Sequence, residues 1–93
     1  MVLKITEVAR TNQEITLLLD GSVTGQWVAL LRECAESVLQ LEMRLTLNLE
    51  NICFIDCEGL AVIKDLIRRG ARQMNAPLFV AEQIKKCEDA ESD

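Results

Sequence analysis

The spacing of hydrophobic residues changes along the chain, and each spacing predicts one kind of element. Residues 2–10 alternate weakly between apolar and polar side chains and predict an edge strand. A polar turn at 11–13 leads to a stronger strand, which begins at Glu14 and stops at Gly21. We therefore expect two strands joined by a short turn.

A helical period follows, from about residue 25 to residue 40. Apolar side chains recur every three or four residues on one face, which is typical of a helix packed on a core; they are Val28, Leu31, Cys34, Ala35, Val38 and Leu39. Ser22 or Thr24 can cap this helix, because a hydroxyl oxygen accepts a hydrogen bond from a free backbone N–H group.

Residues 44–50 alternate strictly, with leucine at every second position, and predict a strand with one buried face. A loop at 51–55 then leads to a second helix near residues 57–69. Asp56 suits its N-cap, Glu58 suits the positive end of the helix dipole, and Gly70 suits the position after the last turn.

The segment after Gly70 allows two interpretations. In one, the helix continues through Met74 and residues 77–82 form a strand. In the other, residues 71–76 hold a short strand and Pro77 opens a third helix near 78–87. We favour the second because Gly70 is a natural helix end. The predicted order is then β-β-α-β-α-β-α, a four-stranded mixed sheet of the α/β class with helices packed mainly on one face.

Acidic charge is concentrated at the C-terminus. The net charge is −5, yet residues 88–93 hold four acidic residues and no basic one, which leaves ten basic and eleven acidic residues in 1–87. We expect one domain at 1–87 and a disordered acidic tail at 88–93.

The near-neutral domain is a poor match for nucleic acid, and no apolar run approaches the roughly 18 residues of a membrane span. The charged N-terminal segment does not suit a signal peptide, so we expect a cytoplasmic protein.

Residues suited to catalysis or metal binding are few. The chain contains no histidine, which excludes Ser-His and Cys-His catalysis, and it has no phosphate-binding glycine loop. Cys53 and Cys57 are spaced C-x3-C without a second pair of ligands, so we expect no structural metal. Reduced thiols fit a cytosolic protein better than disulfides. The sequence therefore predicts neither an enzyme nor a cofactor.

The segment LTLNLENICFIDCEGLAVI resembles the centre of the STAS domain (sulfate transporter and anti-sigma factor antagonist). That family has Phe-x-Asp, then Ser or Thr, a small residue and Gly-Leu at the start of a helix; these positions are Phe54, Asp56, Cys57, Glu58, Gly59 and Leu60. More closely, the D-x-E-G sequence at 56–59 and two further strings resemble stand-alone bacterial STAS-like proteins. Those strings are Gly25-x-Trp27-Val28 and Phe79-Val80-Ala81-Glu82.

The resemblance implies a docking protein that regulates transcription or another signalling process. In anti-sigma factor antagonists the residue after the aspartate is phosphorylated by the anti-sigma factor, a kinase, and the added charge breaks the docked complex. Here that residue is Cys57, which offers no hydroxyl group, and Glu58 already carries a negative charge beside it. We therefore expect a non-catalytic docking module without a phosphorylation site.

We expect the partner to bind where two helices begin, at Thr24, Gln26, Trp27, Asp56, Cys57, Glu58 and Gly59. The partner that the resemblance implies is an anti-sigma-factor-like kinase or a transport complex, and homodimerisation is left open. One alternative is an accessory STAS subunit of a membrane transporter complex, itself not inserted in the membrane. The other is a thiol redox switch at Cys57, which the neighbouring Asp56 and Glu58 disfavour because negative charge opposes thiolate formation.

Each of these features also has a purely structural explanation. Asp56 can simply cap a helix, Gly59 can permit close packing, and Trp27 can belong to the core. Lys64, Arg68 and Arg72 follow one another at intervals of four residues, with Arg72 beyond the expected helix end. We expect a solvated helix face there rather than a basic contact patch.

Overall fold

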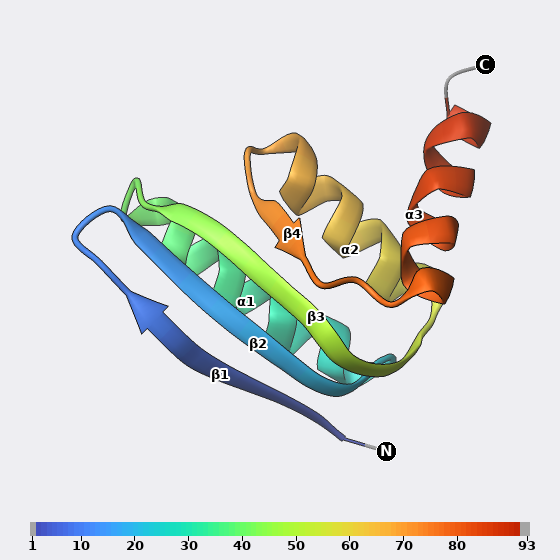
Figure 1. Cartoon of the computed structure of the whole chain (residues 1–93), viewed down its shortest axis with the longest axis horizontal. Coiled ribbons are helices and arrows are strands. Elements are labelled where there is room, and N and C mark those ends of the chain that lie inside the picture. The colour runs from blue at the N-terminus through green and yellow to red at the C-terminus, as the bar shows by residue number, and fades with distance from the viewer. Residues whose placement is uncertain (1, 92–93) are drawn as a thin grey trace.

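The computed structural model describes the backbone of residues 2–91 and the side chains of residues 2–85. Four strands and three helices follow one another in the predicted order (Figure 1). They are β1 (Leu3–Arg10), β2 (Glu14–Val23), α1 (Gln26–Gln40), β3 (Arg44–Ile55), α2 (Cys57–Arg68), β4 (Arg72–Met74) and α3 (Leu78–Glu91). The sheet order is β1-β2-β3-β4, with β1 antiparallel to β2 and the other neighbours parallel. The predicted mixed sheet with an antiparallel edge strand is confirmed.

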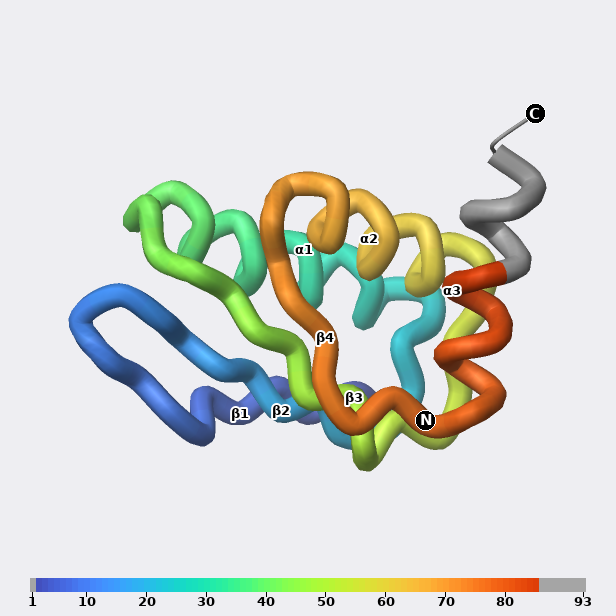
Figure 2. The backbone as a smooth tube through the Cα atoms, turned by 45° about the horizontal axis from the view of Figure 1, so that its top comes forward, coloured from blue at the N-terminus to red at the C-terminus, as the bar shows by residue number. Residues whose placement is uncertain are grey.

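The helices lie mainly on one face of the sheet, as expected. Figures 1 and 2 show α1 and α2 along that face, with α3 beside α2 near one end of the sheet. The strands turn their most buried side chains to this side; these are Ile15, Leu17 and Leu19 of β2 and Leu45, Leu47 and Leu49 of β3. The α3 helix contributes Val80 and Ile84 to the same core. The core is therefore aliphatic and lies between the sheet and the helices.

Two central strands are longer than the sequence predicts. β2 continues past Gly21 to Val23, and β3 continues to Ile55, so the expected strand end at Gly21 and the expected loop at 51–55 are both wrong. Pairing persists through two register shifts, after which Val23 lies opposite Ile55. Gly21 has a φ of 116°, and a Cβ there would lie 2.1 Å from the carbonyl oxygen of Val2. This glycine is therefore a strand irregularity with a close backbone approach, rather than a strand end.

The C-terminal third follows the favoured interpretation. α2 ends where Gly70 takes a φ of 103°, and the backbone N–H of Ala71 donates to the Leu66 carbonyl at 2.9 Å, a typical helix C-terminus. After the three-residue β4, the carbonyl of Pro77 accepts from the N–H groups of Val80 and Ala81, so Pro77 stands just before α3 rather than in its first turn.

α3 continues to Glu91, beyond the expected end near Cys87. The disordered tail at 88–93 stays a prediction, since the side chains there and residues 92–93 lie outside the described part of the chain. Within residues 2–91, no helix is long and apolar enough to span a membrane.

Candidate functional site

One carboxylate joins the first turns of two helices. Asp56 precedes α2, and its Oδ1 accepts a hydrogen bond from the Gly59 N–H at 2.7 Å. Its Oδ2 accepts a second hydrogen bond, at 3.1 Å, from the N–H of Gly25, the residue before α1. The backbone N–H of Asp56 in turn donates to the carbonyl of Val23 at 3.2 Å. The two helix N-termini are therefore held together at the carboxyl end of the parallel strands.

Gly59 allows this end of α2 to lie against β2. A Cβ at this position would lie 2.3 Å from the carbonyl oxygen of Val23 and 2.8 Å from a methyl carbon of the same residue. Side chains in real structures do not approach so closely, and a backbone atom in a paired strand cannot move away easily. Gly59 thus has the packing role that the sequence left as an alternative.

The start of α1 differs from the sequence-based prediction. Its N-cap residue is Gly25, which makes no side-chain cap, so the prediction of Ser22 or Thr24 as the capping residue is wrong. Gly25 adopts φ 53° and ψ −128°, a backbone conformation that favours glycine. The carboxylate of Asp56 accepts a hydrogen bond from the Gly25 N–H instead. A side chain from another element therefore holds the end of α1.

The seven predicted contact residues divide into two groups. Trp27 is partly buried and packs against the core, while Asp56 and Gly59 have the structural roles described above. Gln26, Cys57 and Glu58 are exposed, and Thr24 is half-buried. The exposed group surrounds the point where the two helices begin, so these side chains are available for contact.

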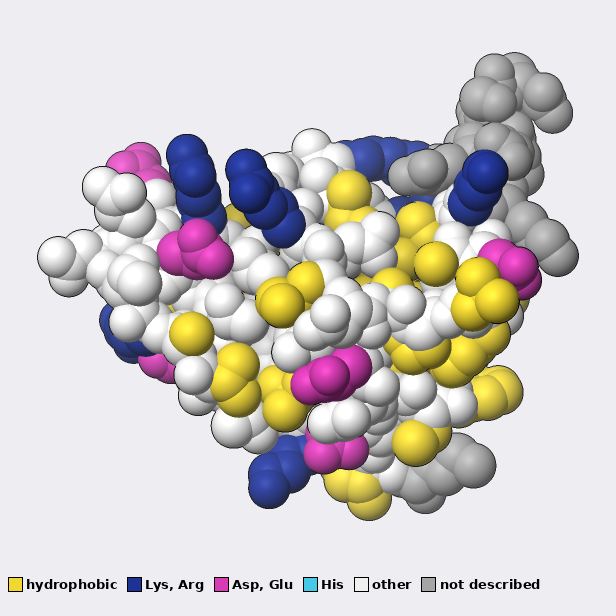
Figure 3. Space-filling view, viewed as in Figure 1, with side chains coloured by type: hydrophobic (Ala, Val, Ile, Leu, Met, Phe, Trp, Pro, Cys, Tyr) yellow, Lys and Arg dark blue, Asp and Glu magenta, His cyan; other side chains and the backbone are white. Residues whose placement is uncertain are grey.

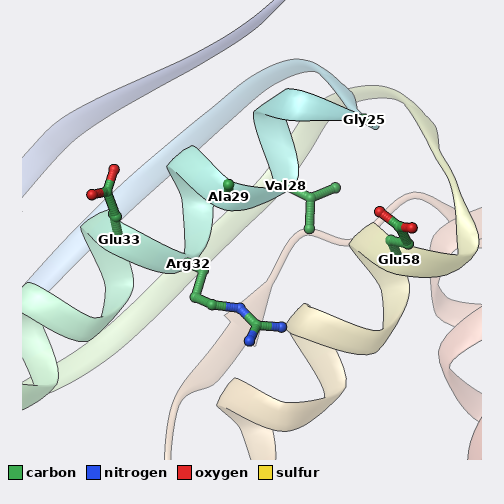
Figure 4. A pocket seen from close by; sticks show the side chains of 6 residues that line it. All are labelled: Gly25, Val28, Ala29, Arg32, Glu33 and Glu58. Carbon is green, nitrogen blue, oxygen red and sulfur yellow. The ribbon is translucent and has the colours of Figure 1, made fainter.

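A shallow cleft of about 510 Å³ runs along the first two turns of α1 and is bounded by Glu58 in the first turn of α2. It is lined by Gly25, Val28, Ala29, Arg32, Glu33 and Glu58. Figure 4 shows Arg32 extending from α1 toward α2, with Glu58 on the opposite side of the cleft and Glu33 turned away. The cleft combines an apolar floor with one basic and two acidic side chains.

Sequence reasoning missed Arg32 as a residue of this site. Arg32 lies one helical turn after Val28, which places both side chains on the same flank of α1. That spacing is visible in the sequence, but nothing local shows that the flank faces α2. Only the relative position of the two helices makes Arg32 part of the cleft.

The basic residues of α2 do not form one solvated stripe. Arg68 is exposed as expected, whereas Lys64 is only 5% exposed, so the prediction of a solvated face is wrong for Lys64. A lysine can bury its aliphatic stem against apolar neighbours. Arg69 connects the helices instead: its guanidinium lies 2.6 Å from a carboxylate oxygen of Glu36 in α1 and 3.7 Å from one of Asp65. The hydrogen bond to Glu36 is the main cause that raises the pKa of Arg69.

Two thiols stand near the site. Cys53 and Cys57 are exposed, and Cys34 is partly buried on the core side of α1. Cys53 belongs to β3 rather than to a loop. Among the described residues, no three potential ligands come together in a way that would hold a metal ion.

No protein-family model matches the sequence, and no curated protein sequence matches it. Among solved structures, the chain is similar to that of the anti-sigma factor antagonist SpoIIAA in its unphosphorylated form, with a TM-score of 0.67 and 17% identity. The match covers 94% of this chain and 81% of that chain. The protein has the STAS fold. The fold predicted from the resemblance of residues 45–63 is therefore confirmed.

Within the STAS fold, the described site lies where β2 and β3 lead into α1 and α2. The position that the resemblance assigns to the phosphorylated residue is Cys57, the first residue of α2. Because this thiol is exposed and directly follows the helix cap, the position is accessible even though the hydroxyl group is missing.

Proposed function

We propose that this chain is a non-catalytic docking module that binds a regulatory protein through the first turns of α1 and α2. The observation that carries the proposal is the double hydrogen bonding of Asp56, which holds Gly25 and Gly59 in a fixed relation. A surface that is already ordered before binding loses less conformational entropy when a partner docks. The exposed Gln26, Cys57 and Glu58 stand on this ordered base.

The similarity to SpoIIAA supports the class of function. SpoIIAA is named an anti-sigma factor antagonist, a protein whose role is exerted on another protein. For this chain we propose a partner of the same general kind, an anti-sigma-factor-like kinase or a transport complex. The site holds no histidine and no nucleophile paired with a base, which favours binding over catalysis.

Docking in this chain does not depend on phosphorylation of the motif. Cys57 stands at the position of the phosphorylated residue, and residues 56–59 contain no serine, threonine or tyrosine. Glu58 is exposed in the first turn of α2, where a negative charge interacts favourably with the helix dipole. We therefore propose a permanently binding-competent surface, or one controlled at another position.

The test begins by isolating the partner with the full chain from its native cell and measuring its affinity in purified form. Cys57→Arg and Glu58→Lys should each weaken binding by about tenfold or more, because each places a positive charge in the centre of the surface. Both positions are exposed, so the unfolding midpoint should stay close to that of the unchanged chain.

The matched control is Glu42→Lys, which makes the same change of charge at an exposed residue just beyond the far end of α1. It should leave the affinity unchanged. A second variant, Arg68→Glu, reverses a charge on the outer surface of α2 and tests whether the partner binds there. If Arg68→Glu abolishes binding while the variants at 57 and 58 bind normally, the partner docks along α2 and the proposed site is wrong.

A further inference from the structure

Arg32 of α1 is an exposed arginine whose guanidinium forms no ion pair with any side chain in the described residues 2–85. Glu36 follows it by four residues, a spacing that commonly supports an ion pair on a helix. Glu36 instead lies 2.6 Å from the guanidinium of Arg69, which also lies 3.7 Å from Asp65. Arg69 therefore engages the carboxylate that α1 itself offers to Arg32, and Arg32 is left unpaired.

The unpaired guanidinium belongs to the cleft along α1. Val28 and Ala29 supply apolar lining, and Glu58 bounds the cleft from α2. Figure 4 shows Arg32 extending toward α2, with Glu58 across the cleft and Glu33 turned away. Among the described side chains, Glu58 has no ion-pair partner either. The cleft therefore presents one positive and one negative group beside an apolar surface.

The cleft is continuous with the proposed docking surface. Gly25, whose N–H group is bound by Asp56, lines the cleft, and Glu58 is one of the exposed residues at the helix tips. An arginine can bind a carboxylate through two parallel hydrogen bonds while its methylene stem packs on apolar neighbours. Because Arg32 has no ion pair among the described side chains, no such pair has to break when a partner carboxylate arrives.

The sheet face that the helices leave open offers a comparison. Figure 1 places the strands in front of α1, so Figure 3 looks onto this face, where acidic, basic and hydrophobic side chains are interspersed. Arg72 of β4 pairs in register with Thr46, which alternates along β3 with the leucines of the core, so both point to the open face. Arg72 is exposed, as Arg32 is, but it lies outside the cleft. It therefore provides a matched control.

We propose that Arg32 and Glu58 set the orientation in which the partner docks. The partner segment in the cleft carries an acidic side chain that binds the Arg32 guanidinium and a basic side chain that lies against Glu58. An apolar residue of the same segment covers Val28 and Ala29. The reversed orientation would bring like charges together, which opposes it. The proposal rests on the docking function and adds a specificity-determining arginine and the charge pattern of the partner.

Affinity measurements with the full chain and the partner isolated from its native cell test the role of Arg32. Arg32→Gln should weaken binding about tenfold, and Arg32→Lys less, because lysine keeps the charge but loses the paired hydrogen bonds. The unfolding midpoint should stay nearly unchanged, since Arg32 is exposed. Arg72→Gln should leave the affinity unchanged. Normal affinity of Arg32→Gln, or equal losses at positions 32 and 72, overturns the proposal.

The same measurements separate this proposal from the docking function itself. If Cys57→Arg and Glu58→Lys weaken binding and Arg32→Gln does not, docking at the helix tips stands and the role of Arg32 is excluded. If Arg32→Gln weakens binding and the two tip variants do not, the partner uses the flank of α1 alone, and both the tip assignment and the opposed charges fail.

Photo-cross-linking then identifies the partner segment and its charges. A photoreactive phenylalanine analogue replaces Glu33, which lines the cleft, and in a control variant Val8, an exposed residue of β1. We expect position 33, and not position 8, to capture a segment with an acidic and a basic residue beside an apolar one. Changing that acidic residue to arginine should restore binding to Arg32→Glu but not to Glu58→Lys. A segment without an acidic residue, no product from position 33, or no restoration overturns the proposal.

Discussion

The side chain of Asp56 and the backbone of Gly25 form a hydrogen bond across 31 residues of sequence, with 3.1 Å between Oδ2 and the amide nitrogen. The same carboxylate caps its own helix at Gly59 through Oδ1. One side chain therefore caps α2 and positions the start of α1. These two hydrogen bonds explain why an aspartate stands at position 56. They also order the surface on which we place the docking site.

Asp56→Ala should lower the free energy of unfolding by about 1–3 kcal/mol. The substitution leaves two helix N–H groups without their acceptor, one of them at a partly buried position, and loss of an N-cap alone typically costs about 1 kcal/mol. Urea unfolding followed by circular dichroism measures the change. Glu58→Ala is the control, because Glu58 is exposed in the same turn and should cost no more than about 0.5 kcal/mol. Equal losses of unfolding free energy in the two variants would show that the two hydrogen bonds of Asp56 add no stability.

Gly59→Ala should destabilise the fold by about 1–3 kcal/mol, because the added methyl group meets the carbonyl of Val23 at 2.3 Å. Alanine is otherwise the better helix former, so the propensity effect has the opposite sign. Thermal unfolding measures the result. Cys57→Ala, two residues earlier at an exposed position, should leave the midpoint nearly unchanged. A Gly59→Ala protein as stable as the parent would mean that α2 can move away from β2 freely.

An anti-sigma-factor-type kinase should transfer no phosphate to residues 56–59, which contain no hydroxyl side chain. Incubation with the kinase and ATP, followed by intact-mass measurement, checks this. Ser22 is only 3% exposed on β2 and should also stay unmodified, whereas Thr24 is half-buried beside the site. A phosphate mapped to Thr24 would move the regulatory switch to the start of α1.

The thiols should differ in reactivity according to their exposure. In variants that each retain one cysteine, Cys53 and Cys57 should react with a maleimide faster than Cys34, which is partly buried. Cys57 should react no faster than Cys53, because both thiols are exposed. A Cys57 rate about ten times that of Cys53 would support the alternative of a redox switch.

The sequence located a helix end correctly where one residue type is strongly preferred at that position. Asp56 marks the start of α2 and Gly70 its end, because a cap needs a side-chain acceptor and the left-handed conformation favours glycine. The same reasoning failed at Gly21. Glycine is compatible with both a strand end and a strand irregularity, and the close approach of the carbonyl of Val2, the residue before β1, decided between them.

The sequence by itself determined the order of the elements, the mixed sheet and its single buried face, since apolar periodicity and caps act within a few residues. The tertiary structure alone decided that Asp56 reaches Gly25, that Lys64 is buried, and that Arg32 lines a cleft with Glu58. It also placed the beginning of α3 beside the end of β3. These features depend on contacts between residues far apart in the chain, and no local pattern records which helix flank will face which neighbour.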